Sequence, residues 1–298
     1  MFLLKAEAGP ELSEVIHTFR DTNREVVHHM SDQKAASTNN PSSKINSAPD
    51  LVPILAPGPA DADLAPEQKR VLLVAAHPDD PEFSSAGTVA AWISKGFEVV
   101  YVLVTSGDKG TPDHEMTRER LSSRREQEQL AAAAKVGVTN VQFLRFPDGE
   151  LTPGLELRGA ITRMIRTFKP YAVVTHDPLA LFINNEFINH PDHRAVGIST
   201  VDAIYPTARD PLQFNEQIRG GLEPHKVKEL FLWGSEYPNV IVDISETIES
   251  KIEALRCHVS QIGNPNELED RIKTRTAQTG EPHGLKYAEV FRRVVMRI

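Results

Sequence analysis

Two short segments carry imidazole and carboxylate groups at a spacing that suits one cation. The first, AHPDDPEF, places His77, Asp79 and Asp80 directly after the apolar run 71–76, and Pro78 stiffens the turn between them. Zn²⁺ binds histidine nitrogen and carboxylate oxygen, and a catalytic zinc has three protein ligands and one open position. His77 and Asp80 can supply two ligands, which leaves Asp79 as a candidate general base. The alternative is an acidic loop in which Asp80 caps the following helix.

The second segment, NHPDHRAVG, lies beyond the apolar run 172–175 and contains His190, Asp192 and His193. One His-Pro-Asp turn is a weak signal, because Pro-Asp often begins a helix. Two such turns, each associated with a predicted strand, favour a shared site. His193 would complete a site of two histidines and one carboxylate. His190 would then face the substrate, with Asp192 fixing its tautomer.

The elements that position both segments are strands alternating with helices. Short apolar runs predict strands, and apolar residues at helical spacing predict helices. The predicted strands are 71–76, 99–105, 141–144 and 172–175, and the predicted helices are 84–96, 117–135 and 155–168, with a further helix from His193 onward. This alternation predicts an α/β fold with an open, mostly parallel sheet and helices on both faces. In such sheets reactive groups follow the carboxyl ends of the strands, where both segments fall.

Composition limits the classes of function. The 298 residues are 40% hydrophobic and 25% charged, as in a globular protein with one large domain or two small ones. The net charge of -8 argues against a nucleic-acid partner. No apolar run approaches the ~20 residues that span a bilayer, and early charges argue against a secretory signal. Cys257 is the only cysteine, which excludes a disulfide framework. We therefore expect a cytoplasmic protein without a membrane span, and a homo-oligomer is left open.

The first 68 residues differ in composition from the rest. From Ser31 to about Gln68 the chain is rich in Ser, Asn, Pro, Ala and Asp and poor in large apolar side chains. Such a segment buries too little apolar surface to form a core. The sequence therefore predicts an N-terminal arm and flexible linker over 1–68 and one domain over 69–298.

Taken together, the motifs resemble the N-acetylglucosaminyl-phosphatidylinositol de-N-acetylase family, also called PIG-L or LmbE-like. The resemblance runs from about Val71 to Arg292, and its anchors are AHPDDPEF, TSGDKGT, PDGEL, HDP, HPDHRAVG, VDIS and ALRCHVSQ. It implies a Rossmann-like fold and a zinc-dependent deacetylase that acts on N-acetylglucosamine-containing molecules. Pro81, the spacer before Glu82, departs from the usual family pattern, and the first 65 or so residues match nothing in the family.

The resemblance also implies residue roles. The residues that match the zinc ligands are His77, Asp80 and His193. Asp79 matches the general base, protonated His190 matches the group that stabilises the oxyanion, and Asp192 matches its partner. Arg125 lies where family members often place a substrate-binding arginine. The implied reaction removes an N-acetyl group from an N-acetylglucosamine-type amino sugar or its conjugate by metal-activated water. Zn²⁺ is the expected cofactor, and Fe²⁺ suits the same ligands in the cell.

Two other readings of the chain compete with this one. A non-catalytic sugar- or nucleotide-binding α/β module is the main alternative, and it is weakened because neither G-x-G-x-x-G nor G-x-x-x-x-G-K-[ST] occurs. A serine hydrolase is weakened because G-x-S-x-G is absent. His176 and Asp177 follow a predicted strand directly, where they either shape the pocket or form a structural turn.

Overall fold

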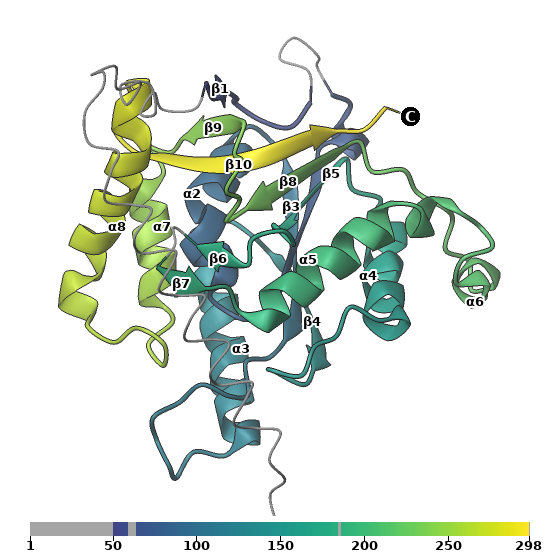
Figure 1. Ribbon diagram of the computed structural model, residues 1–298, viewed down its shortest axis with the longest axis horizontal. Coiled ribbons are helices and arrows are strands. Elements are labelled where there is room, and N and C mark those ends of the chain that lie inside the picture. The colour runs from purple at the N-terminus through teal and green to yellow at the C-terminus, as the bar shows by residue number, and fades with distance from the viewer. Residues whose placement is uncertain (1–49, 59–63, 184–185, 298) are drawn as a thin grey trace, which may run out of the picture. The chain divides into compact units, whose positions relative to one another are not determined.

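The computed structural model describes residues 50–58, 64–183 and 186–297. An eight-stranded sheet, in the order β1-β9-β10-β8-β5-β2-β3-β4, forms the centre of this part of the chain (Figure 1). Its strands are β1 Val52–Pro53, β2 Arg70–Ala75, β3 Glu98–Thr105, β4 Asn140–Phe146, β5 Ala172–His176, β8 Glu229–Trp233, β9 Val240–Asp243 and β10 Ala288–Val295. A separate two-stranded hairpin consists of β6 Phe182–Ile183 and β7 Phe187–Ile188.

The sheet is mostly parallel, as predicted. Strands β4, β3, β2, β5 and β8 run parallel to one another. Strand β10 is antiparallel to both β8 and β9, and β1 is parallel to β9. The strands expected at 71–76, 99–105, 141–144 and 172–175 are confirmed as β2, β3, β4 and β5, with small shifts at their ends.

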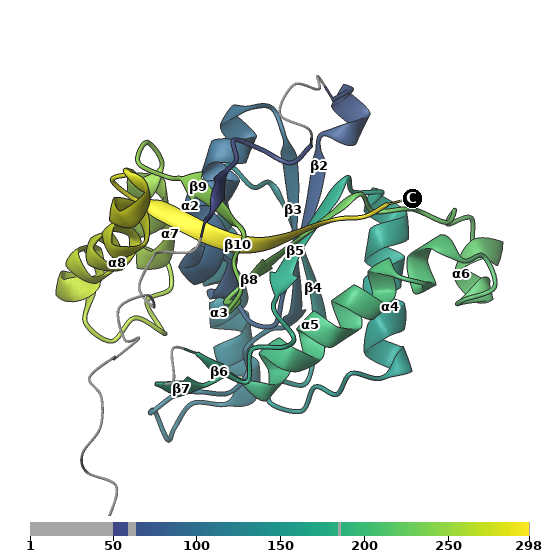
Figure 2. The ribbon, with the colours of Figure 1, turned by 45° about the horizontal axis from the view of Figure 1, so that its top comes forward.

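The α-helices lie on both faces of the sheet (Figure 2). They are α2 Asp80–Ser94, α3 Arg118–Lys135, α4 Leu155–Phe168, α5 Pro191–Ile204, α6 Asn215–Arg219, α7 Ile248–Arg256 and α8 Pro265–Gly280. Successive side chains of β2 point alternately into two apolar cores. Val71 and Leu73 belong to the core that contains Trp92 of α2, whereas Leu72 and Val74 belong to the core formed with α4 and α5. Burial on both faces explains the continuous apolar run.

The order of the strands places the site. From β2 the chain moves outward through β3 and β4, and it then returns to β5 on the other side of β2. The carboxyl ends of β2 and β5 therefore flank a topological switch point, where open α/β sheets bind ligands. His77 follows β2, and His176 ends β5.

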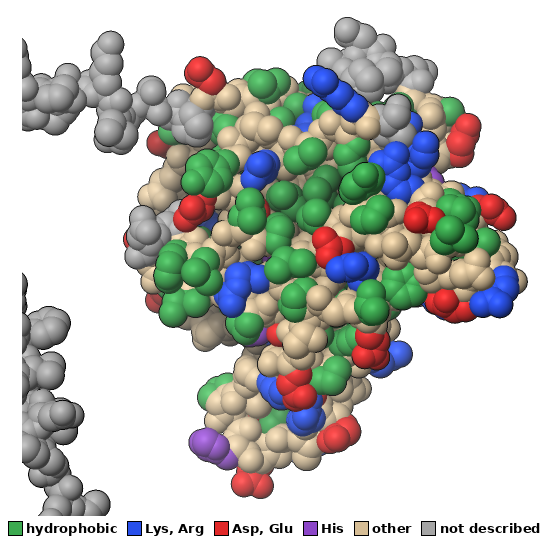
Figure 3. Space-filling model, turned by 45° about the vertical axis from the view of Figure 1, so that its right-hand side comes forward, with side chains coloured by type: hydrophobic (Ala, Val, Ile, Leu, Met, Phe, Trp, Pro, Cys, Tyr) green, Lys and Arg blue, Asp and Glu red, His purple; other side chains and the backbone are tan. Residues whose placement is uncertain are grey.

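Residues 50–58, which fall within the predicted arm, add to the edge of the sheet. Val52 and Pro53 pair with Val240 and Ile241 of β9, and the Gly58 N–H donates to Oε1 of Glu229 at 3.0 Å. Residues 1–49 lie outside the described part, so the boundary at residues 68 and 69 stays a prediction. Within the described ranges no helix is long and apolar enough to cross a membrane. On the face drawn in Figure 3, acidic and basic side chains are interspersed rather than gathered by sign.

Candidate metal centre

The turn after β2 begins α2 without using the Asp79 carboxylate. Asp79 is the N-cap of α2 with φ 90° and ψ -27°, and its side chain makes no capping bond. Instead, its carbonyl oxygen accepts hydrogen bonds from the N–H groups of Glu82 and Phe83, both at 3.0 Å. Asp80 is the first residue of the helix, and its Oδ2 accepts from the His77 N–H at 2.8 Å. Both carboxylates are therefore presented at the end of β2.

Asp80 lies between two of the predicted histidine ligands. Its Oδ1 is 3.1 Å from Nε2 of His193, and its Oδ2 is 3.5 Å from Nδ1 of His77. Two ligand atoms at about 2.1 Å from one tetrahedral ion stand about 3.4 Å apart. The two observed separations lie on either side of that value. Burial alone would raise the pKa of Asp80, but the facing His193 and His176 outweigh it and hold the pKa well below its usual range.

Two carboxylates fix the imidazole of His77. Its Nε2 lies 3.1 Å from Oδ1 of Asp148 and 3.3 Å from Oδ2 of Asp192. Ionised carboxylates only accept hydrogen bonds, so Nε2 carries a proton and Nδ1 faces Asp80. Burial would lower the pKa of His77, but Asp148, Asp192 and Asp80 hold it well above its usual value. A cation at Nδ1 would replace the proton there, because a ligating imidazole is neutral.

The side-chain amide of Asn189 fixes the orientation of the His193 ring. Nδ1 of His193 lies 3.1 Å from Oδ1 of Asn189. The amide nitrogen of Asn189 donates to the Ala180 carbonyl at 2.7 Å, which identifies Oδ1 as the acceptor. Nδ1 of His193 therefore carries a proton, and Nε2 faces Asp80. Such outer hydrogen bonds are typical of metal-binding histidines.

His176 competes with His77 for a place near the cation. Asp80, His176 and His193 form one group that could hold a metal, and His77, His190 and His193 form another. Nε1 of Trp233 donates to Nδ1 of His176 at 3.1 Å. The remaining nitrogen, Nε2, lies 3.4 Å from Oδ2 of Asp80. Burial lowers the pKa of His176 to about 4, so the ring is neutral.

A neutral imidazole has one lone pair, and Trp233 engages it at Nδ1 of His176. The Ala76 N–H donates to the other nitrogen, Nε2, at 3.2 Å. Both ring nitrogens of His176 are thus approached by N–H donors, although a neutral ring can accept at only one of them. Neither nitrogen is free for a cation, which leaves His77 and His193 as the candidate histidine ligands.

Arg125 of α3 contacts the turn that carries Asp79. Its Nη2 donates to the Pro78 carbonyl at 2.7 Å and to Oδ2 of Asp79 at 3.3 Å, and the side chain is only 5% exposed. Burial and the Asp80 charge raise the pKa of Asp79 to about 7, although Arg125 acts in the opposite direction. The guanidinium also packs against Gly107, where an added Cβ would lie 2.4 Å from it. Substrate binding by Arg125 stays a prediction.

His190 and Asp192 meet differently from the sequence expectation. The Asp192 main-chain N–H, and not its carboxylate, bonds to Nδ1 of His190 at 3.1 Å. The carboxylate accepts from the N–H groups of Gly149 at 2.7 Å and Leu151 at 3.3 Å. Because Nδ1 of His190 is an acceptor, Nε2 carries the proton of a neutral ring. Burial, helped by His77 and His193, lowers the pKa of His190. When the ring is neutral it therefore presents an Nε2–H donor, and the protonated His190 expected from the sequence stays a prediction.

Several functional neighbours were not predicted. Asp148 follows β4, so the rule that sites lie at the carboxyl ends of strands could have found it. For His176, which ends β5, the sequence left a pocket residue and a structural turn open, and its contact with Asp80 favours the pocket. Asn189 precedes His190 in the second segment, but nothing in the sequence indicates its bond to His193. Trp233 ends β8, far along the chain from His176, and no local pattern pairs them.

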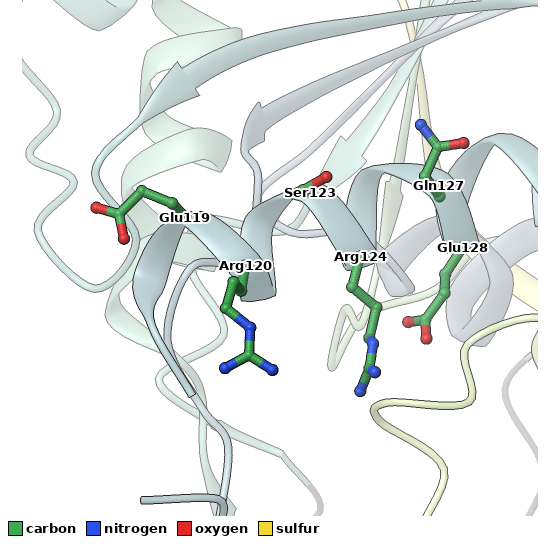
Figure 4. A pocket seen from close by; sticks show the side chains of 6 residues that line it. All are labelled: Glu119, Arg120, Ser123, Arg124, Gln127 and Glu128. Atoms are coloured by element: carbon green, nitrogen blue, oxygen red, sulfur yellow. The ribbon is translucent and has the colours of Figure 1, made fainter. Parts of the chain in front are cut away.

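A cavity of about 470 Å³ adjoins the centre, and Asp80 and His193 form part of its wall. Its other lining residues include Glu236 after β8 and Arg275, Gln278 and Thr279 of α8. A second hollow of about 570 Å³ lies along α3 (Figure 4), lined by Glu119, Arg120, Ser123, Arg124, Gln127 and Glu128. No predicted metal ligand lines this second hollow, so the cavity beside Asp80 is the candidate substrate space.

Residues 72–204, which span both His-Pro-Asp turns, match the GlcNAc-PI de-N-acetylase family, PIG-L. The chain is 34% identical over 228 residues to the diacetylchitobiose deacetylase of Thermococcus kodakarensis, a match covering 75% of this chain and 82% of that protein. The chain belongs to the PIG-L family. The predicted family resemblance is thus confirmed.

Two further proteins are also similar to this PIG-L chain. The 1D-myo-inositol 2-acetamido-2-deoxy-alpha-D-glucopyranoside deacetylase of Mycobacterium sp. strain KMS is 27% identical over 251 residues, covering 68% of this chain and 77% of that protein. The solved structure of N,N'-diacetylchitobiose deacetylase from Pyrococcus horikoshii superimposes with a TM-score of 0.70 at 31% identity, covering 76% of this chain and 84% of that one. The predicted fold class is confirmed by this similarity.

Proposed function

We propose that this PIG-L protein is a zinc-dependent hydrolase that removes the N-acetyl group from an N-acetylglucosamine-type amino sugar or its conjugate. One observation carries the proposal. His77 Nδ1 and His193 Nε2 both face the Asp80 carboxylate, and the other nitrogen of each ring is bound to an acceptor. Two neutral imidazoles and one carboxylate, oriented in this way, are a donor set for catalytic zinc.

Zn²⁺ held by His77, Asp80 and His193 would supply Lewis acidity, polarising the amide carbonyl and lowering the pKa of water toward ~7. Fe²⁺ suits the same ligands. Asp79 would take the proton of the attacking water and return it to the leaving amine. His190 would donate its Nε2–H to the developing oxyanion. Asp192 would support this step by holding Nδ1 of His190 with its main-chain N–H.

The substrate class rests on charge and on the relatives. Asp79, Asp80, Asp148 and Asp192 gather around the centre, so an anionic substrate would meet repulsion, whereas sugar hydroxyls can donate to carboxylates. The named relatives act on diacetylchitobiose and on an inositol-linked acetamido sugar. The cavity of about 470 Å³ beside Asp80 is within the range of ligand pockets and offers room for a second unit beyond the reacting sugar.

A substrate panel tests this proposal. The zinc-loaded protein is incubated with N-acetylglucosamine, N,N'-diacetylchitobiose and an N-acetylated peptide, and free amine and acetate are measured. We expect amine and acetate in equal amounts from the sugars and none from the peptide. Release from the peptide alone would overturn the sugar assignment. Zinc and sugar binding without any release would favour the non-catalytic binding module.

A further inference from the structure

A buried polar cluster lies behind the candidate metal centre and contributes no ligand to it. Its members are Glu82 of α2, Gln129 of α3 and His258, which follows α7, and each is 0% exposed. Nε2 of His258 lies 3.0 Å from Oε2 of Glu82. Nε2 of Gln129 donates to Oε1 of the same carboxylate at 3.0 Å. Buried polar groups are costly unless they are paired, so a cluster of this kind calls for an explanation.

The cluster ends at the main chain of Asp79. The Asp79 N–H donates to Oε1 of Gln129 at 3.0 Å. Because the Glu82 carboxylate only accepts hydrogen bonds, it fixes the amide of Gln129 with nitrogen toward Glu82 and oxygen toward Asp79. His258 holds the other oxygen of that carboxylate. In this series of hydrogen bonds from His258 to Asp79, the preceding bond therefore decides which group donates and which accepts in the next.

Helix α3 holds both ends of one peptide plane. The peptide that joins Pro78 to Asp79 has its carbonyl bonded to Nη2 of Arg125 at 2.7 Å and its N–H bonded to Gln129. Arg125 and Gln129 are four residues apart, so they project from the same face of the helix. The φ angle of Asp79 is 90°, in a region that residues other than glycine rarely adopt. Such conformations persist only where the surroundings hold them, and they concentrate at functional sites.

We propose that Gln129, locked by Glu82 and His258, is a positioning residue that holds the Asp79 carboxylate in its working direction beside Asp80. The inference rests on the proposed role of Asp79 as the base. Gln129 acts through the Asp79 peptide and touches neither substrate nor cation. Loss of the bond would let the peptide plane rotate, and a misplaced base slows proton transfer while the metal ligands stay in place.

The test uses the full-length, zinc-loaded protein and the substitution Gln129→Met, made in the wild type and in the Asp79→Asn variant. In the wild type we expect kcat for N,N'-diacetylchitobiose to fall roughly tenfold or more, with KM and zinc content unchanged. In Asp79→Asn the same substitution should leave the residual kcat unchanged, because no base remains to be positioned. Gln127→Met, on the exposed side of the same helix, is the control and should behave like the wild type.

Equal losses of kcat in both backgrounds would show that Gln129 only supports the fold, and no loss in the wild type would also overturn the proposal. If Gln129→Met does not fold, Glu82→Gln serves instead, because it preserves shape but no longer fixes the direction of the Gln129 amide. It should give a smaller loss of kcat that again disappears in the Asp79→Asn background. A wild-type protein without turnover would refute the proposed function itself, an outcome distinct from these.

Discussion

Asn189 accepts a hydrogen bond from Nδ1 of His193 at 3.1 Å, and its own amide nitrogen is bonded to the carbonyl of Ala180 at 2.7 Å. Asn189 precedes His190, the N-cap of α5, and His193 lies in the first turn of that helix. The amide therefore serves as a fixed acceptor that turns Nε2 of His193 toward Asp80. Asp148 and Asp192 likewise hold Nε2 of His77, which leaves Nδ1 facing Asp80. Neither histidine ring therefore needs to reorient when a cation binds.

Asn189→Leu should weaken zinc binding, because the His193 ring would lose the acceptor that sets its tautomer. Outer-shell changes of this kind reduce metal affinity by about 10–100-fold. Competition with a chromophoric chelator measures the change in Kd. Asn189→Asp keeps an acceptor and should bind zinc more tightly than Asn189→Leu, and Asn266→Leu on the exposed side of α8 is the control. Unchanged affinity in Asn189→Leu would separate Asn189 from the metal site.

Asp79→Asn should leave zinc bound while kcat falls by roughly 10²-fold or more, because the change removes the base and not a ligand. Metal analysis and steady-state kinetics on N,N'-diacetylchitobiose check the two parts separately. Asp270→Asn, an exposed carboxylate on α8, controls for the loss of one charge. Near-normal turnover in Asp79→Asn would remove Asp79 from its role.

Much of this arrangement follows from the sequence. The apolar runs and helical periodicity predict β2 to β5 and α2 to α5, because strands buried on both faces and amphipathic helices leave local patterns. The carboxyl-end rule then brings the two His-Pro-Asp turns together. By contrast, β10 is last in the chain but lies antiparallel between β8 and β9, and no local pattern encodes that insertion.

The candidate site, like the fold, is predicted by the sequence only in part. His77, Asp80 and His193 stand out because imidazoles and carboxylates cluster in short segments. Their supporting partners are single residues from other elements, such as Asp148 after β4. The direction of each hydrogen bond also depends on geometry that residue types do not carry. This is why the tautomer of His190 and the contact through the Asp192 main chain emerge only from the structure.

Arg275→Ala should affect larger substrates selectively. Arg275 lines the cavity beside Asp80 but belongs to α8, away from the predicted ligands. Loss of one charged hydrogen bond of about 1.5 kcal/mol would raise KM for N,N'-diacetylchitobiose near tenfold, while the KM for N-acetylglucosamine stays the same. Arg271→Ala, on the same helix outside the cavity lining, is the control. Equal changes for both sugars would mean that the cavity does not hold the second unit.

Two truncations test the predicted arm. A protein starting at Asp50 should fold and bind zinc, because every predicted site residue follows residue 76. A protein starting at Leu64 also loses β1 and the bonds of Gly58 to Glu229 and Arg293. Unpaired buried groups cost about 1–3 kcal/mol, so its Tm should be lower by several degrees. Calorimetry compares the two proteins, and loss of zinc from the longer one would place part of the site in the first 49 residues.

Zinc dependence of deacetylation tests the central claim most directly. The protein is stripped with a chelator, titrated with Zn²⁺, and assayed at each step for acetate released from N,N'-diacetylchitobiose, with His193→Ala treated in parallel. We predict negligible release from the stripped protein, recovery that reaches its maximum near one zinc per chain, and neither tight zinc binding nor recovery in His193→Ala. Full release from the stripped protein, or a zinc-saturated protein that releases no acetate from any amino sugar, would contradict the account.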